Sequence, residues 1–229
     1  MHCDWGPARM EAVMRNCVLY LLLCLLPLNS GCGCINWLAH VTAPSAPTKN
    51  VKAQFGDLKA KTVAVAVYAG PETLLDYQTV QLEISDAVVA ELRKRVSKVT
   101  VVNPLQVIRY QDENPGWTAL PPEKLCRDLG ADFVLLVSLM EFSTRAPGSI
   151  HLARGRIIAE ASLYKSSQPG ENPSGRPVWR SQLIRVVYPE QSPLGVPVSD
   201  DRDIRLRTAR IFAERLAKNF YDHKVPKEQ

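Results

Sequence analysis

Cysteine is nearly absent from the part of the chain that could fold. Five of the six cysteines fall within the first 34 residues, and Cys126 is the sole one beyond them. A disulfide framework inside the domain is therefore excluded, and a domain of this size does not need one. We expect Cys126 to be a small buried hydrophobic residue; a reactive thiol is the alternative.

Recognisable catalytic and metal-binding motifs are also missing. The four histidines have no carboxylate or cysteine at ligand spacing, and no HExxH, CxxC, GxSxG, P-loop or GxGxxG pattern occurs. We therefore expect no enzymatic activity, no cofactor and no metal, although Cys32 and Cys34 are close enough for a metal pair. The alternative is a hydrolase that uses Asp132 or Asp86 with an unrecognised partner. For Asp132, a capping or loop hydrogen bond at the strand edge is the commoner explanation.

Strong net charge is lacking too. The 229 residues carry a formal charge of +5, with 46% apolar and 22% charged residues, as in globular proteins. This excess is too small to indicate nucleic acid as a partner. It is compatible with anionic surfaces such as lipid headgroups or cell-wall polymer.

No apolar run is long enough to cross a membrane comfortably. The longest, Val18–Leu28, has eleven residues, whereas a spanning helix needs roughly 20. Its length and its flanks are typical of the apolar core of a signal peptide. We expect residues 1–31 to be that signal peptide, with residues 1–13 untranslated if synthesis begins at Met14 (or Met10).

The end of this leader resembles the lipobox of bacterial lipoproteins. In the stretch Leu28–Cys32 (LNSGC) small residues precede a cysteine, although Asn29 departs from the usual aliphatic residue. The resemblance implies that Cys32 is lipidated and becomes the first residue, and several acyl chains would hold the protein firmly at a bilayer. Gly33 replaces the aspartate that often favours inner-membrane retention, so the outer membrane is expected. An ordinary cleaved signal peptide is the alternative.

A linker and one folded domain follow the leader. We expect residues 32–58, with their prolines and no clear periodicity, to be a lipid-anchored flexible linker. About 20 flexible residues span roughly 25 Å, which would keep the domain close to its membrane. We place the domain at residues 59–223 and a tail at residues 224–229.

The patterning of the domain predicts a mixed α/β fold. The β-branched run at 62–68 is typical of a strand buried on both faces, and the longest strand candidate, 131–142, belongs at the sheet centre. The expected order is β-α-β-α-α-β-β-β-α. This is a single three-layer-type domain with a mixed sheet of about five strands, parallel in its first half and antiparallel in its second.

Apolar spacing also predicts which side chains face the core. The inward residues of the two long helices recur at helical spacing: Val80, Ile84, Val88, Leu92 and Val96, then Ala209, Phe212, Ala213, Leu216 and Phe220. The inward residues of the antiparallel strands alternate: Ile157, Ala159, Ala161 and Leu163, then Trp179, Leu183 and Val187.

Four residues are candidates for a binding surface. Arg154, Arg156 and Arg180 are predicted to share one sheet face and could contact an anionic partner; a solvated face crossed by Glu160 is the alternative. Trp117 lies in a polar, proline-containing loop, and tryptophan is enriched at interface hot spots. A loop tryptophan that folds back on its own core is the alternative.

The order of the strands and helices resembles a group of envelope proteins. The residues that carry the resemblance are the strand at 62–68, the amphipathic helix, the strand at 99–102, the stretch 129–135 (LGADFVL) and the Val178-Trp179 step. They are similar to the periplasmic lipoprotein domains of the CsgG, LpoB and TolB-amino-terminal type. An LptE-like lipoprotein of lipopolysaccharide assembly has a comparable layout and stays open.

The resemblance implies a function as well as a fold. Members of that group act as assembly or accessory proteins and have no catalytic residues. We therefore expect a non-catalytic envelope lipoprotein, anchored on the periplasmic side of a bacterial membrane. Its expected role is to dock or assemble a protein partner or to bind cell-wall polymer, with no nucleic acid involved.

Overall fold

The structure is a computed structural model that describes residues 48–149, 151–167, 175–197 and 201–226. Residues Lys49–Val225 form one compact unit. The predicted signal peptide, Cys32 and most of the predicted linker lie outside the described residues. No helix among the described residues is both long enough and apolar enough to cross a membrane.

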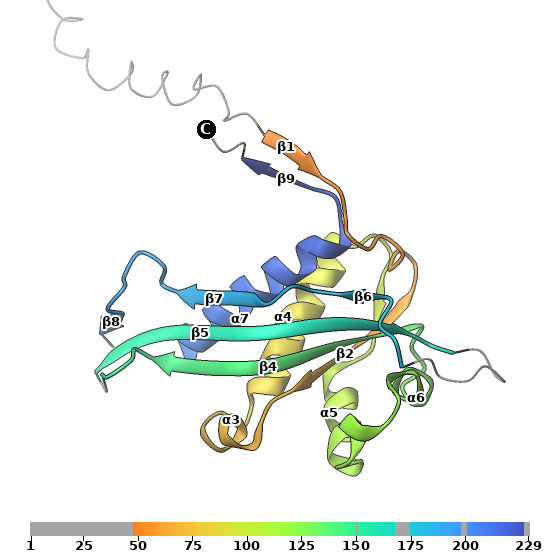
Figure 1. Cartoon of the computed structure of the whole chain (residues 1–229), viewed down its shortest axis with the longest axis horizontal. Helices are drawn as coiled ribbons and strands as arrows, with labels where there is room; N and C mark the ends of the chain where they lie inside the picture. Colours follow the sequence, from red (N-terminus) through yellow and green to blue (C-terminus); the bar gives the residue numbers. More distant parts are fainter. Residues whose placement is uncertain (1–47, 150, 168–174, 198–200, 227–229) are drawn as a thin grey trace, which may run out of the picture. The chain divides into compact units, whose positions relative to one another are not determined.

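A mixed sheet of seven strands is the centre of the fold (Figure 1). Its strands are β2 (Thr62–Tyr68), β3 (Thr100–Val101), β4 (Phe133–Arg145), β5 (Leu152–Lys165), β6 (Trp179–Arg180), β7 (Ile184–Tyr188) and β8 (Val196–Pro197). The order is β3-β2-β4-β5, after which β6, β7 and β8 each pair with β5. The pairs β2–β3 and β2–β4 are parallel and the later pairs are antiparallel. The predicted mixed α/β fold, with parallel strands first, is therefore confirmed.

Helices cover both faces of this sheet. The helices are α3 (Pro71–Asp76), α4 (Val80–Arg95), α5 (Pro104–Glu113), α6 (Pro122–Asp128) and α7 (Asp201–Ala217), with short 3-10 turns at Trp117–Ala119 and Lys218–Phe220. Helices α4 and α7 lie side by side behind the sheet in Figure 1, while α5 and α6 lie on the other side. The α4 and α7 pair is joined by an ion pair between Glu83 and Arg205 at 2.8 Å.

The larger hydrophobic core lies between the sheet and the α4–α7 pair. All ten residues predicted to face inward from the two long helices belong to it, and none is more than 5% exposed. The sheet contributes the predicted residues Ile157, Ala159, Ala161 and Leu163, each at most 1% exposed. Burial of these apolar side chains is the main favourable term in the stability of the fold.

The smaller core lies on the opposite face and covers only part of it. Its members come from α5, α6, the turn at Trp117 and the adjoining ends of β2, β4 and β5. Gly130 ends α6 with φ +63°, as expected for a C-terminal glycine cap. Beyond Val134 and Tyr164 the residues on this face of β4 and β5 are half-exposed.

A bulge corrects the predicted facing of the last antiparallel strand. Trp179 pairs with Leu163, but the next pairings place Ile184, not Leu183, opposite Ala159. Between these two pairings the β6–β7 segment therefore contains one residue more than the stretch of β5 opposite it. One extra residue exchanges the two faces of a strand. Leu183 is 38% exposed and Val187 lies on the face opposite the main core, so both were wrongly predicted to point inward.

The predicted boundaries differ from the observed ones at both ends. A strand β1 (Thr48–Val51) falls in the expected linker, and its partner β9 (His223–Pro226) extends into the expected tail. The phenyl ring of Phe55 packs against Phe133 with ring centroids 5.7 Å apart. The short helix α3, which has no buried residue, precedes α4 and was not predicted. These segments are mostly exposed and lack apolar periodicity, so they carry little sequence signal.

Candidate functional site

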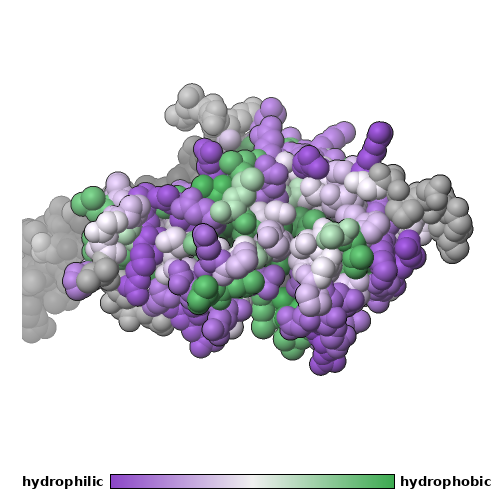
Figure 2. Space-filling model, turned by 60° about the horizontal axis from the view of Figure 1, so that its bottom comes forward, coloured by the Kyte–Doolittle hydropathy of each residue, from purple (hydrophilic) through white to green (hydrophobic). Residues whose placement is uncertain are grey.

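The part of the sheet that α5 and α6 leave uncovered is the candidate site. We call it the open face, and it is formed by Leu136, Ser138, Glu141, Arg154, Arg156, Ile158, Glu160, Ser162, Arg180, Arg185 and Val187. It carries four arginines and two glutamates, with the half-buried apolar residues Leu136, Ile158 and Val187 between them. With the bottom of the molecule turned forward, hydrophobic residues gather near the middle and hydrophilic ones surround them (Figure 2).

Strand pairing places the predicted arginines on this one face. Arg154 and Arg156 alternate along β5 with residues that point into the main core, and Arg180 pairs with Ser162 of the same β5 face. The structure thus brings the three arginines to the same side of the sheet.

The arginines differ in how firmly they are held. One Nη of Arg156 donates to Oε1 of Glu141 at 3.0 Å, across the β4–β5 pair, with both side chains more than a third exposed. One Nη of Arg154 donates to the carbonyl oxygen of Pro193 at 2.6 Å, and its Nε is buried with no partner among the described residues. An exposed pair of this kind contributes about 0–1 kcal/mol to stability, so Arg156 can be redirected to a ligand at little cost.

Arg180 and Arg185 stand at the edge of the open face, beside a hollow of about 870 Å³. The hollow is lined by Gln54, Arg180, Ser181, Gln182, Leu183, Ile184, Arg185, Arg215 and Asn219. The bulge between β6 and β7 lies in its wall: the backbone N–H of Ser181 donates to the carbonyl oxygen of Ala161 at 2.8 Å, and Leu183 is exposed. Arg215 donates to the carbonyl oxygen of Arg185 at 2.6 Å and forms an ion pair with Glu190.

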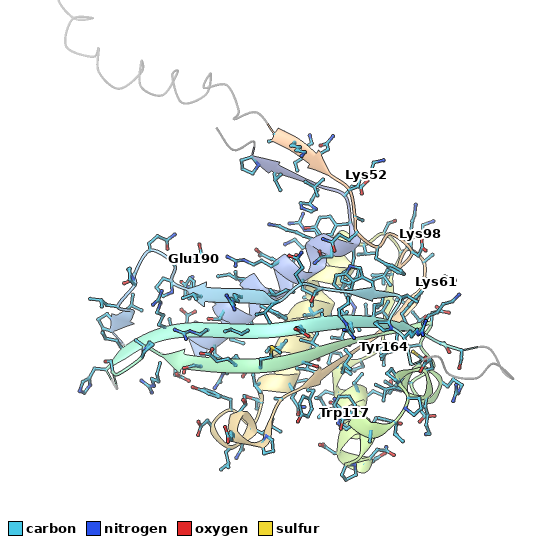
Figure 3. All side chains as sticks on the ribbon, in the orientation of Figure 1. Lys52, Lys61, Lys98, Trp117, Tyr164 and Glu190 are labelled. Atoms are coloured by element: carbon cyan, nitrogen blue, oxygen red, sulfur yellow. The ribbon has the colours of Figure 1, made fainter. Side chains whose placement is uncertain are left out.

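Trp117 is not an exposed aromatic residue. It is 8% exposed and belongs to the smaller core, and its ring meets that of Tyr68 edge-on with centroids 6.4 Å apart. Figure 3 shows Trp117 and Tyr164 on the side of the sheet that α5 and α6 cover. Of the two interpretations of Trp117, the structure shows the one in which the ring folds back on the core, where it belongs to the same cluster as Ala64 and Ala66 of β2.

The residues considered for catalysis are not brought together. Asp132 accepts a hydrogen bond from the backbone N–H of Thr62 at 2.8 Å, which is the capping role. Asp86 is on α4 and lines a different hollow; partial burial raises the pKa of its carboxyl and Arg93 opposes that shift. Burial raises the pKa of the Cys126 thiol to about 12, so the thiol stays protonated at neutral pH. Its Sγ lies 3.7 Å from the carbonyl oxygen of Tyr164.

Some residues of the site were not found from the sequence. Arg185 and Glu141 reach the open face only because bulges shift the phase of their strands. Within the described segments, no group of three histidine, cysteine or acidic side chains could hold a metal ion. Cys32 and Cys34 lie outside those segments.

The fold and the open face together define a mixed α/β domain whose sheet is covered completely on one side and partly on the other. No protein-family model matches the chain, and no curated protein matches its sequence. The resemblance to the CsgG, LpoB and TolB group therefore stays a prediction.

The solved structures to which the chain is similar include bacterial lipoproteins. The PelC dodecamer from Paraburkholderia phytofirmans shares 11% identity over 76% of this chain and 98% of its own, with a TM-score of 0.43. Lipoprotein GNA1162 from Neisseria meningitidis shares 14% identity over 68% and 97%, with a TM-score of 0.41. The protein CT253 from Chlamydia trachomatis shares 14% identity over 69% and 96%, with a TM-score of 0.38. At these values the likeness assigns no family and no activity.

Proposed function

We propose that this protein is a lipid-anchored component of the bacterial envelope that binds a protein partner through its open face and has no catalytic activity. The observation that carries the proposal is the open face itself: a sheet surface with apolar side chains bordered by arginines on rigid strands. Arginine is enriched among the residues that contribute most to protein–protein binding, and uncovered apolar surface beside it is typical of binding sites.

The charge of the open face indicates the kind of partner. The open face carries four arginines and two glutamates, and one of these glutamates, Glu141, is already paired with Arg156. Arg180 and Arg185 are exposed and have no ion pair among the described residues. A partner that presents carboxylates around an apolar centre would complement this surface, since arginine binds carboxylates with two parallel hydrogen bonds.

The membrane anchor is the second part of the proposal, and it rests on the leader. The apolar run Val18–Leu28 ends in Ser30-Gly31-Cys32, which resembles a lipobox. A lipid on Cys32 would hold the domain at the periplasmic side of one membrane. We propose the outer membrane, because the residue after the cysteine is Gly33 and not the aspartate that favours retention in the inner membrane. The non-catalytic role is supported by the separation of Asp132 and Asp86 into different hollows.

Two experiments test these two parts. The variant Cys32→Ala should move from the membrane to the soluble fraction of cells; retention in the membrane would contradict the anchor. For the open face, a photo-crosslinking residue at Glu160 should capture one discrete partner in cells, while the same residue at Glu214 on α7 should not. Equal capture from both positions would contradict binding through the open face.

A charge-reversal pair makes the second test sharper. Arg180→Glu with Arg185→Glu should abolish the crosslink from position 160, because the two introduced glutamates would repel the carboxylates that the arginines normally bind. Arg109→Glu with Arg210→Glu makes the same change in charge at two exposed arginines of α5 and α7 and should leave the crosslink intact. Loss of the crosslink in both double variants would show a general charge effect and contradict the assignment.

A further inference from the structure

A cluster of lysines gathers where the strands β2, β4 and β5 meet the loops that precede or follow them. We call it the basic end, and it consists of Lys59, Lys61, Lys98 and Lys165. Three of them, Lys59, Lys61 and Lys165, line one hollow of about 890 Å³. The backbone N–H of Ala60 donates to the carbonyl oxygen of Ser97 at 3.4 Å, which places Lys98 beside the Lys59–Lys61 turn. Figure 3 shows Lys61 and Lys98 on the same side of the molecule.

These lysines are exposed, and none of the four has an ion-pair partner among the described residues. The two carboxylates of the hollow are Asp57 and Asp132, and Asp132 is held by the backbone N–H of Thr62 at 2.8 Å. Lys98 is one of two non-glycine residues with positive φ among the described residues, at 57°. This conformation is uncommon for a lysine. The hollow thus holds three lysines against two carboxylates and keeps a net positive charge, and Lys98 adds a fourth cation beside it.

A second basic hollow lies at the neighbouring ends of α4 and α7. Lys94, Arg95, Lys218 and Lys224 line it, with the carboxylate of Asp222 accepting from the backbone N–H of Ala53 at 2.8 Å. Glu91 neutralises part of this charge through its ion pairs with Lys94 and Arg95. The basic end and this hollow together hold eight of the 28 lysines and arginines, against the four carboxylates of Asp57, Asp132, Asp222 and Glu91.

The chain reaches the basic end directly from the segment that would carry the anchor. Cys32 precedes the first described residue, Thr48, by 16 residues, and a fully extended chain covers at most about 3.6 Å per residue. The start of β1 therefore lies within about 58 Å of a lipidated Cys32, whatever the conformation between them. Lys59 and Lys61 follow β1 by about ten residues, across a loop whose Phe55 lines the same hollow.

We infer that the basic end is a binding surface for anionic lipid headgroups, which holds the domain against the membrane in one orientation. Lysine stems can lie along a bilayer surface while their ammonium groups meet phosphates. Val178, 46% exposed on the rim of the hollow, adds an apolar contact. The inference rests on the proposed membrane location, but its test does not require the lipid anchor.

The test uses residues 48–229, because Lys49–Val225 is a compact unit that contains both hydrophobic cores. This fragment is mixed at low salt with vesicles of phosphatidylcholine and phosphatidylglycerol in equal amounts, or of phosphatidylcholine alone, and binding is measured by sedimentation. We expect binding to the anionic vesicles only, with a marked decrease at about 0.5 M salt, where charges are screened within a few ångströms.

The variant Lys59→Gln, Lys61→Gln, Lys165→Gln should bind anionic vesicles on the order of 100-fold more weakly, since each lysine near an anionic surface contributes about fivefold. Arg109→Gln, Arg207→Gln, Arg210→Gln removes the same charge from α5 and α7 and should reduce binding by less than about fivefold. Circular dichroism spectra of both variants should match the parent.

Three results would overturn the inference: equal binding to phosphatidylcholine vesicles, an equal decrease in both triple variants, or equally tight binding to duplex DNA that the lysine substitutions also abolish. The last result would make the basic end a general polyanion site. Because the fragment lacks Cys32 and no partner is present, failure of this test leaves the anchor and open-face experiments unaffected.

Discussion

Gly155 of β5 lies directly against Thr208 of α7. A Cβ added to Gly155 would stand 1.8 Å from the hydroxyl oxygen of Thr208 and 2.9 Å from its Cβ, distances that no real contact tolerates. Thr208 is 1% exposed, and its hydroxyl donates to the carbonyl oxygen of Ile204 at 2.6 Å. This close approach sets how near α7 can lie to the sheet.

Gly155→Ala should therefore destabilise the protein by about 2–4 kcal/mol, because overpacking in a filled core forces the backbone apart. Urea unfolding measures the loss. Gly56→Ala is the matched control, since a Cβ at Gly56 meets nothing within 4 Å. Adding Thr208→Ala to Gly155→Ala should recover part of the loss, and additive effects of the two changes would contradict the contact.

The bulge between β6 and β7 predicts opposite responses at two neighbouring apolar positions. Leu183→Glu should change the free energy of unfolding by less than about 0.5 kcal/mol, since the side chain is 38% exposed. Val186→Glu should remove the cooperative thermal transition, because Val186 is fully buried in the main core and an unpaired charge there costs several kcal/mol. Equal melting temperatures for the two variants would show that the register is different.

Cys126 should be unreactive in the folded domain. Residues 48–229 contain no other cysteine, so labelling of this fragment reports on Cys126 alone. Burial raises the pKa of its thiol from 9.0 to about 12, so at pH 8 the thiolate is about a thousand times scarcer than for an ordinary thiol. Labelling by a maleimide at pH 8 should become fast only in denaturant. Rapid labelling of the native fragment would contradict the buried position.

The Asp128 carboxylate should titrate at a pH that depends on two neighbours. Hydrogen bonds from Lys124 and from the hydroxyl of Tyr110, both at 2.6 Å, hold the pKa of Asp128 below its ordinary value. Lys124→Gln should raise this pKa most, and Tyr110→Phe should raise it less, as carbon-13 NMR of the carboxyl group can measure. An unchanged pKa in both variants would contradict the hydrogen bonds.

The same depressed pKa gives a direction for the dependence of stability on pH. The folded state binds this proton less readily than the unfolded chain, so the stabilisation is fully present above the ordinary carboxyl pKa near 4 and is lost as the pH falls through the folded value. The melting temperatures of Lys124→Gln and Tyr110→Phe should therefore differ most from that of the parent near neutral pH and least at about pH 2. Asp128 is mostly exposed, so solvent screening keeps the effect small.

The sequence determined the elements with strong periodicity. Apolar residues recur along α4 and α7 at helical spacing and along β5 at every second position. Side chains with these spacings lie on one face of the helix or strand, so the pattern specifies which face is buried. The order of the elements then predicted a mixed sheet, parallel first and antiparallel afterwards. Three of the four arginines of the open face, Arg154, Arg156 and Arg180, were placed together for the same reason, from alternation alone.

The tertiary structure decided what depends on register and on long-range contact. The bulge that turns Leu183 outward and brings Arg185 to the open face is one residue long, and no local pattern marks it. Trp117 was a candidate for a binding surface because it lies in a polar loop, but in the structure its ring is buried and packs against Tyr68. The hollow at the basic end joins lysines that are up to 106 positions apart, from Lys59 to Lys165. Such proximity exists only once the strand ends meet, because sequence patterns report what each segment buries and not which segments become neighbours.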